Sequence, residues 1–162
     1  MPGQQHEVTF RFLAQPTDVN FGGKVHGGMA MKWIDQAGYA CAVGWSGMYC
    51  VTASVSGIQF VAPILIGDLV SVHARLIYTG HSSMHLLVDV FAGDLRQGQS
   101  RLATSCVMVL VALDAPDGKP TAVPAWLPRD ADEQRLQAKA QELQALSRGM
   151  QRLVDTADGC SA

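Results

Sequence analysis

HGGMAMKWIDQAGYACAVGW, residues 26–45, is the stretch that decides the fold of this 162-residue chain. Apolar residues crowd every side of a helix drawn through it, which predicts a helix that is buried all round. Its small residues, among them Ala37, Gly38 and Ala42, allow other parts of the backbone to approach closely. Because glycines weaken an isolated helix, we expect tertiary packing to hold this one in place.

On both sides of this helix the pattern changes to the alternation typical of strands. One strand is predicted over residues 6–13, followed by a loop over 15–25 that is rich in Gly, Pro, Asp and Asn. Four more are predicted after the helix, over 51–60, 69–78, 83–91 and 101–113. Strands joined by short turns pair antiparallel, and a buried helix must lie against their sheet. The sequence therefore predicts an α+β domain with a five-stranded antiparallel sheet wrapped around one long helix.

The C-terminal part of the chain differs in composition. Three prolines between residues 120 and 128 indicate a linker that runs over the surface. Residues 129–154 then carry an apolar stripe at helical spacing, formed by Leu136, Leu143, Leu146, Met150 and Leu153. We divide the chain into a domain over 1–124 and a linker with an amphipathic helix over 125–162. That helix is expected to pack on the body or on a neighbouring subunit.

Composition excludes several classes of protein. The chain is 48% hydrophobic and 16% charged, with a net charge of −2 and no basic cluster, which argues against nucleic-acid binding. No apolar run reaches the ~20 residues that span a bilayer, and no signal peptide is visible, so we expect no membrane insertion and a cytoplasmic location. The four cysteines form no CxxC pair, which predicts reduced thiols and no zinc site.

Three features near the start of the predicted helix bear on chemistry. Gly27 and Gly28 open the helix, where free amides can polarise a carbonyl, although glycines there also serve simply to make the turn. Asp35 interrupts the apolar surface of the helix, where a carboxylate is costly to bury. It is either a general base or nucleophile, or a carboxylate whose charge is satisfied by a hydroxyl or backbone donor. Asn20 in the preceding loop either holds a water molecule or a carbonyl group, or is an ordinary asparagine of a turn.

The spacing of these residues constrains how they can act together. Gly28 and Asp35 are seven residues apart, so they share one face of the helix but lie ~10 Å apart along its axis. An oxyanion donor and a base must both reach a single carbonyl, each within ~3 Å. Two antiparallel copies of the helix in a two-fold dimer meet this requirement, which predicts an obligate homodimer if these residues work together.

The ordered set of motifs resembles the acyl-CoA hydrolases of the hotdog superfamily. The pattern is D-x-N, then H-G-G, then an acidic residue seven positions after the second glycine, and here it lies within PTDVNFGGKVHGGMAMKWIDQAGYA, residues 16–40. The likeness continues through VTASVSGIQFVAPILIGDLV (51–70), YTGHSSMHLLVDV (78–90) and VALDAPDGKPTAVP (111–124). It covers most of the chain except its two ends.

The resemblance implies a site and an assembly. Asp35 would be the catalytic carboxylate, Asn20 would orient the water or the thioester, and the amide of Gly27 or Gly28 would polarise the thioester carbonyl. Dimers would join their sheets edge to edge and assemble further into tetramers or hexamers. The phosphates and adenine of coenzyme A would lie near one turn and one arginine: Gly80, His81, Ser82, Ser83 and Arg101.

Two other functions stay open at this point. A hotdog hydratase or dehydratase of acyl thioesters needs a histidine paired with the acid, and His26 is the one nearby histidine, which can also contact the substrate or Asp35. A non-catalytic module would bind acyl-CoA and use its C-terminal helix to engage a partner. Acyl-CoA hydrolysis without metal or cofactor is the function that the motifs favour.

Overall fold

The computed structural model describes residues 1–158, with side chains given to residue 151, so the side chain of Leu153 and all of Cys160 lie outside the described part. The elements are β1 (Glu7–Leu13), α1 (Gly27–Ser46), β2 (Tyr49–Phe60), β3 (Leu69–Thr79), β4 (Ser83–Gly93), β5 (Arg101–Leu113) and α2 (Ala131–Asp158). A single 3-10 turn, Pro16–Asp18, lies in the loop before α1. Every element expected from the sequence is present, with ends that differ by a few residues.

The five strands form one antiparallel sheet in the order β1-β3-β4-β5-β2, which leaves β1 and β2 at its edges. Edge strand β2 is irregular, because its pairing with β5 shifts between Thr52 and Ser54 and again between Ser56 and Gln59. A shift of one residue reverses which side chains face the helix. As a result Cys50 and Val55 both pack in the core although an odd number of positions separates them.

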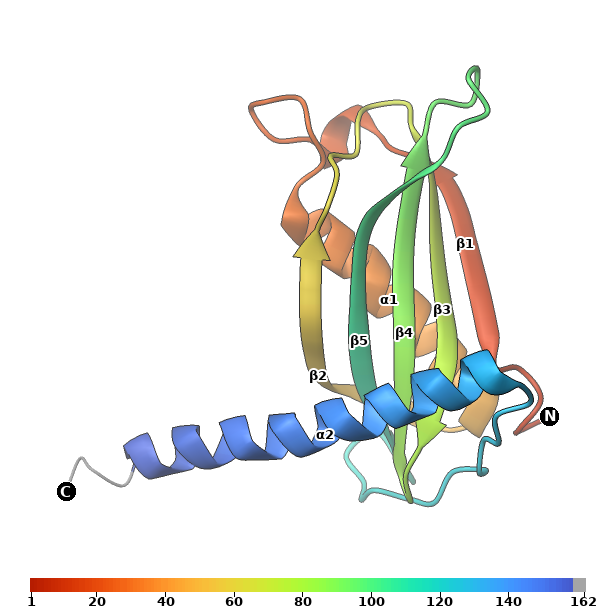
Figure 1. The fold of residues 1–162 in the computed structure, drawn as a ribbon, viewed down its shortest axis with the longest axis vertical. Helices are drawn as coiled ribbons and strands as arrows, with labels where there is room; N and C mark the ends of the chain where they lie inside the picture. Colours follow the sequence, from red (N-terminus) through yellow and green to blue (C-terminus); the bar gives the residue numbers. More distant parts are fainter. Residues whose placement is uncertain (159–162) are drawn as a thin grey trace.

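The core lies between α1 and one face of the sheet (Figure 1). Ile34, Ala37 and Cys41 are fully buried against the sheet. At Gly38 a β-carbon would lie 2.8 Å from Sδ of Met108, so either the Met108 side chain or the helix would have to shift. The small residues of α1 therefore do what the sequence indicated, since they bring the helix backbone down onto the sheet.

One expectation about α1 is wrong for the single chain. The helix is not buried all round, because a stripe of it is exposed: Gly28, Lys32, Asp35, Gln36 and Tyr39. The physical reason is that a single sheet covers a single side of a helix. The opposite side, which carries Asp35, faces away from the sheet at the surface of one protomer.

Helix α2 crosses the opposite face of the sheet and then runs beyond it (Figure 1). Ala140 of α2 and Ile77 of β3 are both buried although neither belongs to the core around α1. Further along, Leu146 and Met150 are 65% and 69% exposed. The first part of α2 thus packs on the body as expected, whereas part of its apolar stripe is uncovered.

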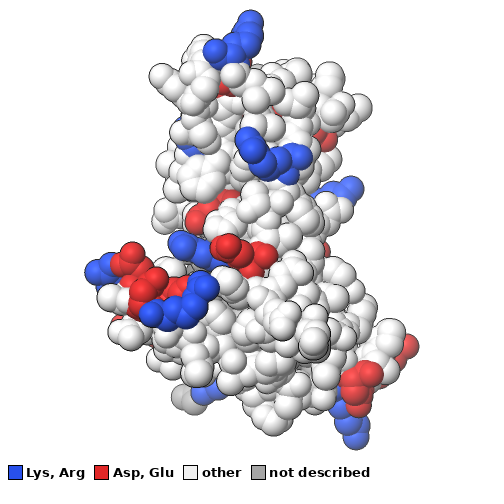
Figure 2. All heavy atoms as spheres, turned by 90° about the vertical axis from the view of Figure 1, so that its right-hand side faces the viewer, with Lys and Arg blue, Asp and Glu red and all other residues white. Residues whose placement is uncertain are grey.

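On the face shown in Figure 2, charged side chains form no large patch of one sign, because basic side chains lie singly or among acidic ones. Among residues 1–158, no helix is both long and apolar enough to cross a membrane.

Candidate functional site

The structure brings three of the expected site residues together around one cavity. Asn20, His26 and Gly27 line a space of about 400 Å³ at the N-terminal end of α1. Its opposite wall is the segment that follows β2, residues 61–64. Lys24 contributes a cation to the lining. This cavity is open enough to admit a ligand to the start of the helix.

The side-chain carbonyl oxygen of Asn20 is hydrogen-bonded, whereas its NH₂ group has no partner among the described residues. Its Oδ1 accepts hydrogen bonds from the amides of Gly22, at 2.9 Å, and Lys24, at 3.3 Å. The loop therefore fixes the carbonyl side of the amide and leaves the NH₂ group as a donor. Asn20 can hold the oxygen of a water or of a carbonyl in the cavity.

The start of α1 presents backbone donors to the same cavity. His26 is the N-terminal cap residue, but its side chain makes no capping hydrogen bond. The amides of Gly27 and Gly28 have no acceptor among the described residues, as is usual in the first turn of a helix. The ring of Phe60 lies over Gly27, where a β-carbon would come within 3.3 Å of Cζ, whereas Gly28 faces open space. Glycine at both positions keeps these donors accessible.

Asp35 lies elsewhere on α1, in a different environment. Its Oδ1 accepts a hydrogen bond from the hydroxyl of Thr52 at 2.7 Å. Thr52 belongs to β2, so the bond joins the exposed side of the helix to the edge strand. Sequence reasoning anticipated a hydroxyl donor as one alternative but did not identify Thr52.

The two groups do not meet in one chain. Asp35 does not line the cavity that contains Asn20 and Gly27. The helix rise places it ~10 Å along the axis from Gly28, as the spacing required. Each protomer therefore carries two separate halves of the expected constellation.

The residues expected to contact coenzyme A are also split. Ser83 pairs with Val111 while Ala92 pairs with Arg101, so the turn over residues 80–83 and Arg101 lie at opposite ends of the β4–β5 pair. His81 in that turn is exposed.

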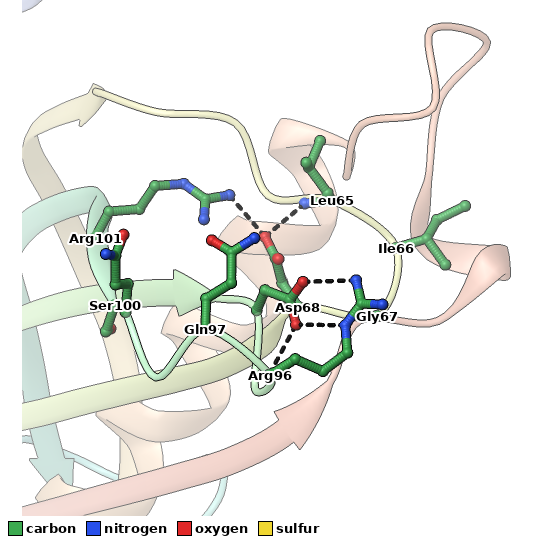
Figure 3. Close-up of a pocket in the computed structure, with 10 residues that line it drawn as sticks. Leu65, Ile66, Gly67, Asp68, Arg96, Gln97, Ser100 and Arg101 are labelled. Carbon is green, nitrogen blue, oxygen red and sulfur yellow. Dashed lines mark hydrogen bonds and ion pairs between the residues drawn. The ribbon is translucent and has the colours of Figure 1, made fainter.

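Arg101 is engaged within its own chain. It lines a surface pocket of about 610 Å³, where its guanidinium donates to Oδ2 of buried Asp68 at 2.7 Å (Figure 3). It also donates to the carbonyl oxygens of Pro63 and Ala92. Its charge is balanced by Asp68, which leaves it poorly suited to bind a phosphate in this position.

The described cysteines are not nucleophiles. Cys41, Cys50 and Cys106 are buried free thiols. Burial raises the pKa of Cys41 to about 12 and that of Cys106 to about 11, and it also raises the pKa of Cys50. At neutral pH these side chains are thiols rather than reactive thiolates.

Comparison with known proteins identifies the family. Residues 22–99 match the Thioesterase superfamily. The acyl-CoA thioester hydrolase YciA of Salmonella typhimurium is 34% identical over 123 residues, which are 74% of this chain and 92% of that protein. The chain belongs to the hotdog-fold acyl-CoA thioester hydrolases. Its reaction is the hydrolysis of acyl-CoA to the free acid and coenzyme A, and the sheet packed on α1 is the hotdog fold.

Solved structures of similar acyl-CoA thioester hydrolases agree with this assignment. The acyl-CoA hydrolase of Staphylococcus aureus, in complex with butyryl coenzyme A and coenzyme A, is 28% identical with a TM-score of 0.82, covering 98% of this chain and 95% of that one. That enzyme has also been solved with an asparagine, an aspartate or a threonine replaced by alanine. A hexameric thioesterase from Yersinia pestis is 36% identical with a TM-score of 0.67, covering 72% of this chain and 93% of that one.

Proposed function

We propose that this acyl-CoA hydrolase uses Asp35 as its general base, in a site shared by two protomers. Asp35 takes a proton from a water molecule, whose oxygen attacks the thioester carbonyl carbon. The amides of Gly27 and Gly28 stabilise the oxyanion that forms, and the amide NH₂ of Asn20 holds the water. The carbon–sulfur bond then breaks, and the departing thiolate receives the proton from Asp35.

The observation that carries this proposal is the hydrogen bond from Thr52 to Asp35 on an exposed helix face. It fixes a carboxylate that makes no ion pair with a described residue, on a side of α1 that the chain's own sheet does not cover. In the S. aureus enzyme the substituted aspartate follows the asparagine by 15 positions and precedes the threonine by 17. Asn20, Asp35 and Thr52 have the same spacing, which supports a common role.

A two-fold dimer accounts for the separation of the two halves. The exposed stripe of α1 and the unpaired edge of β2 are adjacent surfaces on which a second copy can dock. In such a dimer the cavity at Asn20 and Gly27 of one protomer faces Asp35 and Thr52 of the other. The hexameric state of the Y. pestis relative supports a further assembly of three dimers.

The coenzyme A nucleotide is assigned to the exposed turn over residues 80–83, contributed by a neighbouring protomer. We give Arg101 a structural role in place of the phosphate contact that the resemblance implied. His26 lines the cavity beside Gly27, where it can contact the pantetheine arm.

Mixed assemblies of two inactive variants test the shared site. Asp35→Asn and Asn20→Ala chains with different affinity tags are co-expressed, and assemblies that contain both are isolated and assayed. In a heterodimer one of the two shared sites is fully wild type, so isolated heterodimers should have about half of the wild-type activity and an unsorted random mixture about a quarter. A site built within one chain would leave every mixed assembly inactive.

The matched control pairs Asp35→Asn with Thr52→Val. Both substitutions lie in the same half of the site, so no heterodimer contains a wild-type site. Activity in this mixture should stay at the level that the Thr52→Val chains contribute alone. Recovery here as well would contradict the proposed division of the site.

A further inference from the structure

A second cavity, separate from the proposed active site, lies between α2 and the outer face of the sheet. Its volume is about 250 Å³. The sheet contributes Ser54, Ser56, Ser83, His85, Val107 and Val109 to its lining, and α2 covers it. Since α1 packs on the other face of the sheet (Figure 1), this cavity under α2 lies away from the proposed site of hydrolysis, and it shares only Ser83 with the turn assigned to the coenzyme A nucleotide.

His85 is the buried polar group of this cavity. The residue is 2% exposed, and its Nε2 has no hydrogen-bond partner among the described residues. The ring lies beside that of Tyr78, with centroids 5.0 Å apart. Burial lowers the pKa of His85 to about 4, so its imidazole is neutral at neutral pH. A buried polar atom without a partner is rare in native proteins, so Nε2 of His85 is available to bond a water molecule or a ligand in the cavity.

The lining specifies the chemistry of that group. Among the described lining residues Arg148 carries the one formal charge, and no carboxylate is present. Hydroxyl groups from Ser54, Ser56, Ser83 and Ser147 add hydrogen-bond donors. Apolar surface comes from the valines of β5 and from Leu143. A cation, several donors and a short apolar wall suit an amphipathic anion better than a cation or a purely apolar molecule.

We propose that the cavity under α2 binds a short- or medium-chain monocarboxylic acid. The carboxylate is held by Arg148 and by the Nε2–H of His85, and the acyl chain lies against Val107, Val109 and Leu143. Free carboxylic acids are the products of acyl-CoA hydrolysis, so the enzyme generates this ligand class itself. The proposal does not depend on Asp35 being the base.

Magnetic resonance of the histidine side chains tests this site directly. The protein, labelled with ¹³C in its histidines, is titrated with octanoate, and the His85 signal is assigned by its loss in His85→Gln. We expect a saturable shift of the His85 signal that is the same in Asp35→Asn. Octylamine and 1-octanol, with the same chain but no negative charge, should leave it in place.

Two variants complete the test. Arg148→Gln should weaken the apparent affinity for octanoate tenfold or more while thiol release without added acid stays at the wild-type rate. His73→Gln, on the same face of the sheet but outside the cavity, should titrate like wild type. An unmoved His85 signal, an equal response to octylamine, or undiminished binding in Arg148→Gln would each overturn the proposal.

Discussion

Thr52 Oγ1 lies 2.7 Å from Asp35 Oδ1, and this hydrogen bond joins the edge strand β2 to the exposed face of α1. The bond orients the carboxylate and leaves its second oxygen available for a water molecule. The family assignment makes the chain an acyl-CoA hydrolase, and this pair supplies the carboxylate of the proposed mechanism.

Substitution of Thr52 tests how much this orientation matters. Thr52→Val removes the donor at nearly constant volume, and a hydrogen bond to a charged group contributes about 1.5–3 kcal/mol. We expect kcat to fall about tenfold or more, with KM little changed, in a thiol-release assay. Thr52→Ser keeps the hydroxyl and should restore most of the rate. Equal losses in both variants would show that packing, and not the hydrogen bond, is what Thr52 provides.

The Asp68–Arg101 ion pair is expected to stabilise the wall of the proposed active site. Asp68 also accepts a hydrogen bond from the amide of Leu65, and Arg101 donates to the carbonyl of Pro63, so the pair holds the segment beside the Asn20 cavity. Arg101→Gln leaves a buried carboxylate uncompensated, and because Arg101 is partly exposed we expect a loss of about 2–3 kcal/mol in the free energy of unfolding.

Urea unfolding of the single and double variants measures this effect. Asp68→Asn combined with Arg101→Gln should be less destabilised than the sum of the single variants. Arg96→Gln, which breaks the exposed pair with Asp94, is the matched control and should unfold like wild type. A strictly additive double variant would show that the two side chains act independently.

The exposed turn over residues 80–83 is expected to recognise the nucleotide of coenzyme A. His81→Ala should raise KM several-fold for an acyl-CoA and leave KM unchanged for the matching N-acetylcysteamine thioester, which lacks the nucleotide. Steady-state kinetics with both substrates checks this. A parallel change in both KM values would place His81 near the reacting end of the substrate instead.

Stability is expected to depend on pH through His85. Its pKa is lowered to about 4 in the folded protein, whereas a histidine in an unfolded chain titrates near 6.5. Between these values the unfolded chain binds a proton that the folded chain excludes, so the free energy of unfolding falls as the pH drops from about 6.5 to 4 and is fully retained above 6.5. The contribution amounts to up to about 3 kcal/mol.

Unfolding curves recorded across this pH range isolate the effect of His85. As the pH falls from 6.5 to 4, the free energy of unfolding of wild type should decrease relative to that of His85→Leu, because the leucine has no proton to gain. A difference that is independent of pH would rule out a neutral buried imidazole.

The order of elements and the architecture of the domain were predictable from the sequence, because local periodicity reports helix and strand directly. The exposed stripe of α1 was not, since apolar residues such as Met31 beside Asp35 look the same whether a sheet or a second subunit covers them. Thr52 was missed because the irregular pairing of β2 changes which side chains face the helix. The partnership of Asp68 with Arg101, and the position of His85 under α2, depend on contacts between distant parts of the chain that no local pattern records.

The catalytic role of Asp35 is tested most directly by thiol release from a series of acyl-CoAs, with wild type and Asp35→Asn assayed side by side. Gln97→Ala, in the exposed turn between β4 and β5, serves as the control. The proposed mechanism predicts that Asp35→Asn loses a hundredfold or more in kcat, given the ~10²–10⁴ that general bases contribute, while Gln97→Ala keeps its rate. Thiol release by Asp35→Asn near the wild-type rate would contradict the central claim and remove Asp35 from the mechanism.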